Sequence, residues 1–360
     1  MRIINQKLQI PDFPFSVRLY DAKTVYIDIE TTGLNRHRSH LYLLGAMWAG
    51  EGQVQLRQWF AERPSDEEEI LRDFFSFIRE FDHLIQFNGS SFDLPYLRHK
   101  AAFYEIEAVF PPAVTDLYHL YRPLKNLLLQ EDMKLTHLEV SAGYDRTDHH
   151  SGKELIKVYD SYLQTADPAL LAGLLQHNTD DIVGMLWLEA FDGLLKLQKG
   201  SLSPADCPVS ADPQTGYLNF SCRYDTLSLP PVTVQETDGI RVTCRKNLVT
   251  LTVPVYEGTL YHFFTDYKNY YYFPSEDRAM HKSVAVYADP ASRIKATKDT
   301  CYEPHTGRFL RTFAPLDLLM FQTKEREASL WFVSYKEALL KDPAFCSLYA
   351  VHMISHLLSR

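Results

Sequence analysis

Hydrophobic and polar positions follow two different periods in the first half of the chain. Short apolar or alternating runs predict β-strands at residues 24–29, 41–48, 53–60, 83–87 and 114–117. Runs in which apolar residues recur every three or four positions predict helices that begin at Ser65 and Leu94, with several more up to Leu197. Residues 1–18 are mixed in character and are interpreted as a lead-in strand or arm. Three strands followed by strand–helix alternation predict an α/β fold, a mixed sheet flanked by helices.

The pattern changes after residue 199. Residues 199–213 combine Gly, Ser, Asp and Pro and are interpreted as a linker. Beyond it, an alternating β-branched stretch predicts strands, and we expect a strand at 284–287 and helices at 316–321, 335–340 and 345–358. The predicted organisation is a domain of residues 1–200 and a smaller, mainly β accessory domain of residues 214–360 with terminal helices.

The accessory part is rich in aromatic residues between positions 256 and 273. A run of basic residues follows: Arg278, Lys282, Arg293, Lys295, Lys298, Arg308 and Arg311. Rings and cations together are typical of surfaces that stack bases and contact phosphates. They also fit a small β core with a solvated basic face, and the neutral balance of residues 201–360 leaves both interpretations open.

Two acidic side chains interrupt an apolar strand near the start of the chain. Asp28 and Glu30 alternate with apolar residues, so both carboxylates point to one face of that strand. Carboxylates in an apolar setting are costly unless a cation lies between them. The pattern therefore indicates a divalent metal site.

Two later segments carry residues of related chemistry. Asn88, Phe92 and Asp93 follow the strand at 83–87 and open a helix; taken alone, Asp93 would be an N-cap and Asn88 a turn residue. His177 and Asp181 are four residues apart in a helical stretch and share one helix face. Histidine is a natural general base near neutral pH, although this pair would also suit an ordinary helix surface.

Other acidic and histidine residues are weaker candidates. Asp180 competes with Asp181 and is interpreted either as an acid behind the metal ligands or as a solvated residue. His149 and His150 follow Asp145 and Asp148 in a polar stretch, for which a flexible surface loop is preferred over a metal site. Asp116, at the end of a predicted strand, is interpreted as structural.

Together the three segments resemble the motifs of the DEDD exonuclease superfamily, which has an RNase H-like fold. Over residues 23–197 the chain is most similar to the bacterial YprB-like group of RNase H-like proteins. One departure concerns His177, because members with a catalytic histidine place it five residues before the last Asp. Here a histidine stands at the four-residue spacing that other members use for tyrosine.

The resemblance implies a metal-dependent nuclease, with two Mg²⁺ or Mn²⁺ ions held by Asp28, Glu30, Asp93 and Asp181. Asp28 would bridge both ions, and His177 would orient or deprotonate the attacking water. The resemblance also implies a nucleic-acid partner, DNA or RNA, cut from its 3′ end. The residues it places against the substrate are Thr31, Gly33, Leu34, Asn88 and Phe92.

Charge and composition exclude some other classes of protein. The net charge of −9 arises entirely within residues 1–200, where 29 acidic residues face 20 basic ones, which argues against a tight passive nucleic-acid binder. The five cysteines contain no Cys-x-x-Cys, which disfavours a zinc ribbon and suits reduced thiols. The sequence shows no apolar run of bilayer length and no signal peptide, so we expect a cytoplasmic protein without a membrane partner.

Three alternatives stay open at this point. The motifs set the chemistry and not the substrate geometry, so a structure-selective endonuclease fits them as well as an exonuclease. The acidic charge and the unusual position of His177 also allow a nucleic-acid-binding protein with weak or no catalysis. A third interpretation is a module that docks another protein through its accessory domain.

Overall fold

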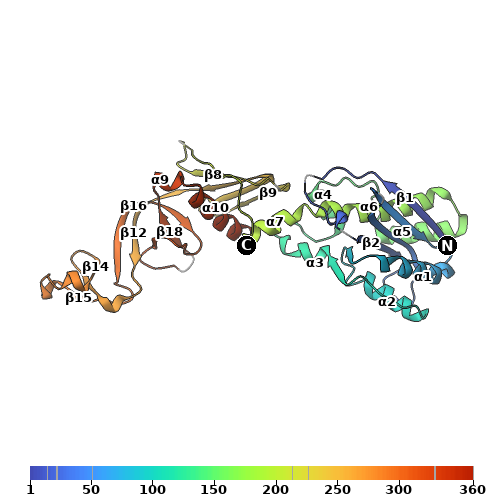
Figure 1. Cartoon of the computed structure of the whole chain (residues 1–360), viewed down its shortest axis with the longest axis horizontal. Helices are drawn as coiled ribbons and strands as arrows, with labels where there is room; N and C mark the ends of the chain where they lie inside the picture. Colours follow the sequence, from blue (N-terminus) through green and yellow to red (C-terminus); the bar gives the residue numbers. More distant parts are fainter. Residues whose placement is uncertain are drawn as a thin grey trace. The chain divides into compact units, whose positions relative to one another are not determined.

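A computed structural model of the chain describes residues 1–13, 15–21, 23–50, 52–212, 214–225, 227–327 and 330–359. The chain divides into two compact units (Figure 1). The first unit is Met1–Leu195 with the short segment Thr226–Pro230, and the second is Lys196–Asp225 with Pro231–Arg360.

A six-stranded mixed sheet forms the centre of the first unit. Its strand order is β1 (Arg2–Leu8), β4 (Gln53–Phe60), β3 (Leu41–Gly50), β2 (Thr24–Thr31), β5 (His83–Gln86) and β6 (Ala113–Asp116). β2 pairs antiparallel with β3 and parallel with β5, and this change of direction makes the sheet mixed. The predicted fold class is confirmed, and the lead-in segment forms the edge strand β1.

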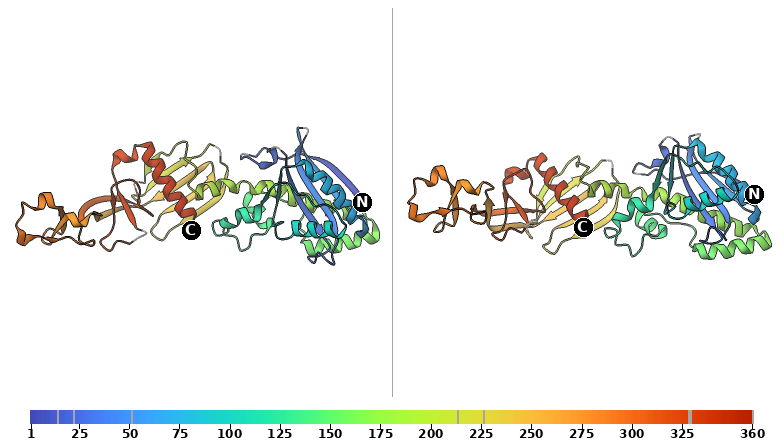
Figure 2. Two further views of the ribbon diagram at one scale, coloured as in Figure 1. Left: turned by 60° about the horizontal axis from the view of Figure 1, so that its bottom comes forward. Right: turned by 90° about the horizontal axis from the view of Figure 1, so that it is seen from below.

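Helices cover both faces of this sheet, as the views in Figure 2 show. The helices up to the end of the first unit are α1 (Glu67–Phe77), α2 (Asp93–Phe103), α3 (Leu117–Tyr121), α4 (Leu135–Ala142), α5 (Gly152–Thr165), α6 (Pro168–Leu188) and α7 (Phe191–Gln198), and not all of them lie on the sheet. The predicted start at Ser65 is a 3₁₀ turn, Pro64–Asp66, and α1 begins after it. Its apolar stripe, including the fully buried Ile70 and Phe74, joins the core beneath the sheet.

The longest helix, α6, packs across β2 and β3. Gly45 of β3 permits the close approach, because a Cβ built there would lie 2.2 Å from Asn178 Oδ1 and 2.4 Å from Ile182 Cδ1. The helix therefore lies directly on the face of the sheet to which Asp28 and Glu30 point. This contact places residues 177–181 beside the acidic strand.

Two glycines of α6 offer a matched test of how tightly this helix is packed. A Cβ at Gly184 would lie 2.0 Å from Oε1 of the buried Glu139, whereas a Cβ at Gly173 would meet nothing within 4 Å. We expect Gly184→Ala to lower the free energy of unfolding by about 1–3 kcal/mol, because overpacking displaces Glu139. Gly173→Ala should raise it by roughly 0.5–1 kcal/mol, since alanine is the better helix former. Urea unfolding of both variants checks this, and equal effects would contradict it.

The second unit is built mainly from three antiparallel sheets. The five-stranded sheet contains β7 (Val209–Ala211), β8 (Leu218–Arg223), β11 (Leu248–Val253), β10 (Arg241–Lys246) and β9 (Leu229–Gln235). The four-stranded sheet contains β12 (Val255–Phe263), β16 (Tyr302–Thr312), β18 (Trp331–Ser334) and β17 (Met320–Phe321). The small three-stranded sheet contains β14 (Arg278–His281), β13 (Tyr270–Phe273) and β15 (Ile294–Lys295).

Helices complete the second unit, and three local predictions for this part of the chain were wrong. Residues 284–287 overlap helix α8 (Lys282–Ala285), which starts where the side chain of His281 caps the backbone N–H of Ser283. Residues 316–321 end in strand β17, because pairing with β18 buries Met320 and Phe321. The interpreted linker contains strand β7. The predicted terminal helices are found as α9 (Glu337–Leu340) and α10 (Pro343–Leu358).

The cysteines of the second unit are free thiols. Cys207 and Cys222 are distant in the sequence, yet their sulfur atoms lie 3.0 Å apart because β8 pairs beside the segment that precedes β7. Among the residues that the structure describes, none of the helices combines the length and apolar character that a membrane span requires.

Candidate active site

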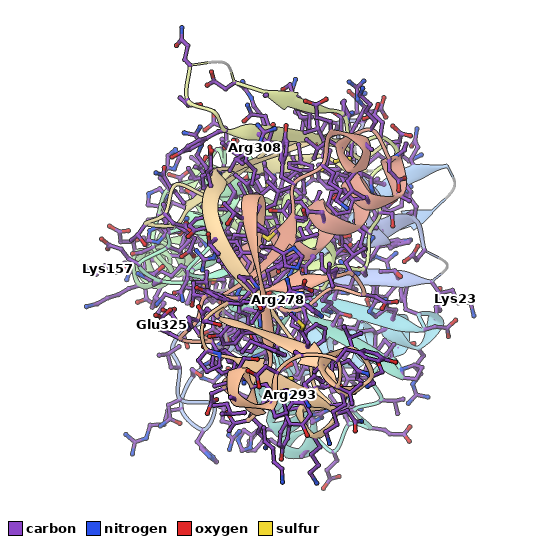
Figure 3. The ribbon with its side chains drawn as sticks, turned by 90° about the vertical axis from the view of Figure 1, so that its left-hand side faces the viewer. Lys23, Lys157, Arg278, Arg293, Arg308 and Glu325 are labelled. Carbon is purple, nitrogen blue, oxygen red and sulfur yellow. The ribbon has the colours of Figure 1, made fainter. Side chains whose placement is uncertain are left out.

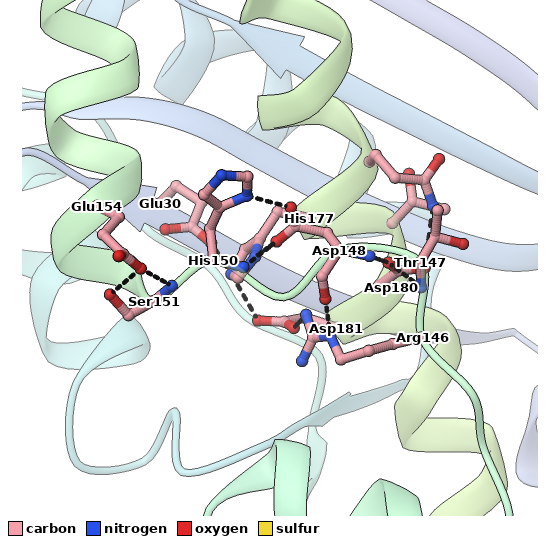
Figure 4. A network of polar contacts seen from close by, with 12 residues as sticks. Glu30, Arg146, Thr147, Asp148, His150, Ser151, Glu154, His177, Asp180 and Asp181 are labelled. Atoms are coloured by element: carbon pink, nitrogen blue, oxygen red, sulfur yellow. Dashed lines mark hydrogen bonds and ion pairs between the residues drawn. The ribbon is translucent and has the colours of Figure 1, made fainter.

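Side chains from separate segments of the chain converge on the face of β2. Glu30 comes from the end of this strand, and His177 and Asp181 come from successive turns of α6. One ligand atom of each of these three side chains lies within 4.8 Å of the others (Figure 4). Their arrangement agrees with the predicted one-face positions on the strand and on the helix.

Asp28 and Asp93 belong to the same electrostatic cluster. Burial, followed by the carboxylates of Asp181, Glu30 and Asp93, raises the pKa of Asp28 well above its ordinary value. Burial and the charges of Asp181 and Asp93 raise the pKa of Glu30 in the same way. The carboxylates of this cluster repel one another, and divalent cations are the groups that best relieve such repulsion.

Asp93 lies where the loop after β5 enters α2. Gly89 makes room for it, because a Cβ at that position would lie 2.9 Å from Asp93 Oδ2. Asp116 holds the loop by accepting hydrogen bonds from the backbone N–H groups of Asn88, at 2.8 Å, and Ser90, at 3.0 Å. Asn88 has a φ of +56°, a conformation that asparagine tolerates well. The structural interpretation of Asp116 agrees with these contacts.

Asp93 gives the metal-free site a dependence on pH. Burial, then the carboxylates of Asp116 and Asp181, raises its pKa to about 7, above the unfolded value of about 3.9. Its contribution to stability is therefore present below pH 4 and is lost as the pH rises through 7. In chelator, we expect the stability of Asp93→Asn relative to wild type to rise by about 1–2 kcal/mol between pH 5.5 and pH 8. Urea unfolding at both pH values checks this, and a constant difference would contradict it.

His177 is held from behind by an aspartate that sequence reasoning assigned to a surface loop. Asp148 is 8% exposed, and its Oδ2 lies 2.6 Å from His177 Nδ1. The other ring nitrogen, Nε2, faces Glu30 Oε1 at 3.4 Å and Asp181 Oδ2 at 3.5 Å. His150 contacts the remaining oxygen of Asp148 from the surface, whereas no described contact ties His149 to the site.

Arg146 is a second residue that sequence reasoning missed. It is 8% exposed, and its Nη2 lies 2.6 Å from Asp181 Oδ1, on the side of that carboxylate away from His177. Its Nη1 lies 3.2 Å from Glu139 Oε2, and its Nε donates to the carbonyl oxygen of Asp148. Arg146 therefore fixes both the orientation of Asp181 and the path of the loop that carries Asp148.

Asp180 anchors this loop and is not a solvated residue. It is 2% exposed and accepts hydrogen bonds from four donors: the Tyr144 hydroxyl, the backbone N–H groups of Thr147 and Asp148, and the Gln176 amide. The neighbouring acids thus divide their tasks, because Asp180 faces the loop and Asp181 faces the site. Of the two open interpretations, the acid behind the ligands is the one that agrees with this position.

Asn178 links the sheet to the helix at the same level. Its amide nitrogen donates to Asp28 Oδ2 at 2.9 Å, and its amide oxygen accepts from Gln58 of β4 at 2.9 Å. The link orients the Asp28 carboxylate. In the sequence, the only sign of this role of Asn178 is that it is a polar residue directly after His177.

The residues expected to contact substrate lie at the end of β2 and in the segments that follow β2 and β5. Leu34 is 85% exposed in the turn after β2, where the Thr31 hydroxyl donates to the Gly33 carbonyl oxygen. Phe92 is half-buried and packs at a tilt against Tyr96, just before α2. Side chains that leave an apolar surface open at such a rim are suited to contact a base or sugar.

The aromatic and basic residues of the second unit form a less unified surface. Arg293 lies 4.8 Å from the ring of Tyr271, and Arg308 lies 4.1 Å from the ring of Tyr335. Figure 3 shows Arg308 well apart from Arg278 and Arg293. A cavity of about 420 Å³ in this unit is lined by rings and two cations, among them Tyr261, Phe263, Phe264, Tyr267, Lys298 and Arg326. Because several cations already stack on rings of the protein itself, the base-stacking surface stays a prediction.

Comparisons with known proteins connect the first unit to a superfamily. The family model of the RNase H superfamily matches residues 25–190. YprB of Bacillus subtilis (strain 168), an uncharacterised protein, is 25% identical over 186 residues, which are 51% of this chain and 44% of YprB. The chain thus spans less than half the length of the curated relative it matches.

Solved structures that are similar to this chain include a family B DNA polymerase from the archaeon Pyrobaculum calidifontis, at 14% identity and a TM-score of 0.40. The match covers 93% of this chain and 46% of the polymerase chain. Exonuclease I of E. coli, solved with a dT13 oligonucleotide, has 12% identity and a TM-score of 0.32, over 58% of this chain and 54% of its own. The residues that the RNase H superfamily model matches, 25–190, are thus the part of the chain that carries the site.

Proposed function

We propose that the chain is a metal-dependent nuclease of the DEDD type that hydrolyses phosphodiester bonds in DNA or RNA from the 3′ end. The observation that carries the proposal is the meeting of Glu30, His177 and Asp181 within 4.8 Å, with Asp28 and Asp93 in the same electrostatic cluster. An RNase H-superfamily fold supports this chemistry. We propose residues 1–200 as the catalytic domain and residues 214–360 as an accessory domain.

The residues fit the cations that this function requires. Asp28, Glu30, Asp93 and Asp181 would hold two Mg²⁺ or Mn²⁺ ions, for which carboxylate oxygens are suitable ligands. Bound there, such ions would supply an activated water and would stabilise charge on the leaving oxygen. The mutual elevation of the pKa values of Asp28, Glu30 and Asp93 is what a site built for cations shows without them.

The surrounding residues prepare these ligands. Asn178 orients Asp28, Arg146 orients Asp181, and Asp148 orients His177, whose free Nε2 faces the cluster. A preorganised set of this kind needs little rearrangement when substrate binds. Much of the rate enhancement of enzymes comes from such preorganisation. We propose His177 as a catalytic residue, and Thr31, Gly33, Leu34, Asn88 and Phe92 as contacts to the nucleic acid.

A cleavage assay with the full chain tests the proposal. End-labelled single-stranded and duplex DNA and RNA are incubated with Mn²⁺ or with Mg²⁺, and with chelator as the control. We expect a ladder that shortens from the 3′ end only when the metal is present. Internal fragments would instead identify an endonuclease. Binding without any cleavage by the folded, metal-loaded protein would replace the nuclease with a nucleic-acid-binding role.

A further inference from the structure

We propose that His177 is a nitrogen ligand of the ion held by Glu30 and Asp181, and that Asp148 is its positioning residue. The site would therefore take a transition-metal ion such as Mn²⁺ or Zn²⁺ in preference to Mg²⁺. The inference rests on the proposed function, because it concerns the same site. It differs from that proposal in the chemical class of the ion and in the role of the histidine.

The separation of the ligand atoms supports a direct bond. Nε2 of His177 lies 3.4 Å from Glu30 Oε1 and 3.5 Å from Asp181 Oδ2. Ligands about 2.1 Å from one ion are about 3.0 Å apart when they are adjacent on an octahedron and about 3.4 Å apart on a tetrahedron. Both distances to the histidine therefore allow its nitrogen and each carboxylate oxygen to bind one ion.

Each of the three side chains turns one polar atom to the shared space and has the other held elsewhere. Asp181 Oδ1 is bound by Arg146 at 2.6 Å, which leaves Oδ2 facing His177. Glu30 Oε2 lies 3.5 Å from the Tyr42 hydroxyl, which leaves Oε1 facing His177. Three ligand atoms are thus oriented by neighbours before any ion arrives.

Asp148 orients the imidazole ring of His177 for ligation. Asp148 Oδ2 is 2.6 Å from His177 Nδ1, which positions the carboxylate to accept the Nδ1 proton and leaves Nε2 as the nitrogen that would bind the ion. The aspartate is fixed in turn, because its backbone N–H donates to Asp180 and its Oδ1 contacts His150. Carboxylate–histidine pairs of this kind typically orient metal ligands in proteins.

His177 is evidence for a bound ion that is separate from the acidic cluster. It is 6% exposed, and no described hydrogen bond involves its Nε2. An imidazole ligand favours borderline metal ions, whereas Mg²⁺ prefers oxygen. A buried imidazole nitrogen aimed between two carboxylates therefore points to the class of ion as well as to its place.

Electron spin-echo spectroscopy of Mn²⁺ bound to the full chain tests the ligation directly. We expect a ¹⁴N coupling from directly bound imidazole. In protein labelled with ¹⁵N-histidine a ¹⁵N coupling should replace it, and in His177→Gln the coupling should be lost. Bound Mn²⁺ without nitrogen coupling in the wild type would overturn the inference. The wild-type spectrum alone decides this outcome, so the test does not depend on whether a variant folds.

Metal titration by calorimetry tests the positioning role. Asp148→Ala should weaken Mn²⁺ binding by about 10–100-fold, as loss of such an orienting partner typically does. The loss of affinity for Mg²⁺ should be much smaller. Asp160→Ala is the matched control, since it makes the same change at an exposed position of α5 outside the site, and its Mn²⁺ affinity should equal that of the wild type. Equal loss of Mn²⁺ and Mg²⁺ affinity in Asp148→Ala would overturn the positioning role.

The two proposals fail in different ways. Cleavage with Mn²⁺ but without nitrogen coupling would leave the nuclease in place and remove His177 from the ligands. Nitrogen coupling without cleavage of any nucleic acid would support the ligation and overturn the nuclease.

Discussion

Asp28→Asn should reduce phosphodiester cleavage by at least about a thousandfold, or roughly 4 kcal/mol of transition-state stabilisation. Asp28 lies within the apolar strand β2, and its carboxylate accepts a hydrogen bond from Asn178 at 2.9 Å. Asparagine has the same size but no charge to hold a cation. Because burial and neighbouring acids disfavour the Asp28 charge, its removal should not unfold the protein.

The measurement is the initial rate of 3′-end shortening of a labelled oligonucleotide at saturating Mn²⁺. Asp160→Asn is the matched control, since it makes the same chemical change at an exposed position of α5 and should keep full activity. Circular dichroism and urea unfolding establish that both variants are folded. An Asp28→Asn protein within tenfold of the wild-type rate would remove Asp28 from catalysis.

The parts of the site that lie on regular elements could be predicted from the sequence. Asp28 and Glu30 share a face because a strand has a period of two, and His177 and Asp181 share a face because a helix brings positions four apart together. In both elements the period alone fixes where a side chain points. The core of the first unit was predictable for the same reason.

The residues that orient the ligands could not be predicted in this way. Arg146 and Asp148 lie in a loop without a period, and that loop is held at the site because Asp180 of α6 accepts hydrogen bonds from its backbone. Only the folded chain shows this connection. A polar stretch with several charged and histidine residues looked like a solvated loop, although Arg146 and Asp148 are both nearly buried.

Errors in the second unit have a different cause. Residues 316–321 contain enough leucine and methionine to suit a helix, yet strand pairing between β17 and β18 decides their conformation. Short elements in a β-rich unit depend on partners that are distant in the sequence. Local pattern therefore predicts them less well than the long helices of the first unit.

Arg146→Met should destabilise the metal-free protein by about 3–5 kcal/mol, the usual cost of removing one partner of a buried ion pair. Arg146 is 8% exposed and lies 2.6 Å from Asp181 Oδ1. Burial raises the pKa of its other partner, Glu139, to about 8, so near neutral pH Arg146 chiefly balances Asp181. Methionine fills a similar volume but leaves Asp181 facing Asp28 and Glu30 without compensation. Urea unfolding in chelator measures the loss.

A double variant shows whether Arg146 stabilises the protein through its charge or through packing. If Arg146 acts by balancing Asp181, Arg146→Met combined with Asp181→Asn should recover at least about half of the lost stability, because no uncompensated carboxylate then remains at that position. Saturating Mn²⁺ should also reduce the cost of Arg146→Met alone, since a cation bound by Asp181 would replace the missing charge. A double variant no more stable than Arg146→Met would show that the arginine acts through packing and its hydrogen bond to the Asp148 carbonyl oxygen. If Arg146 acts through its charge, the protein should tolerate the loss of Arg146 once Asp181 has been neutralised.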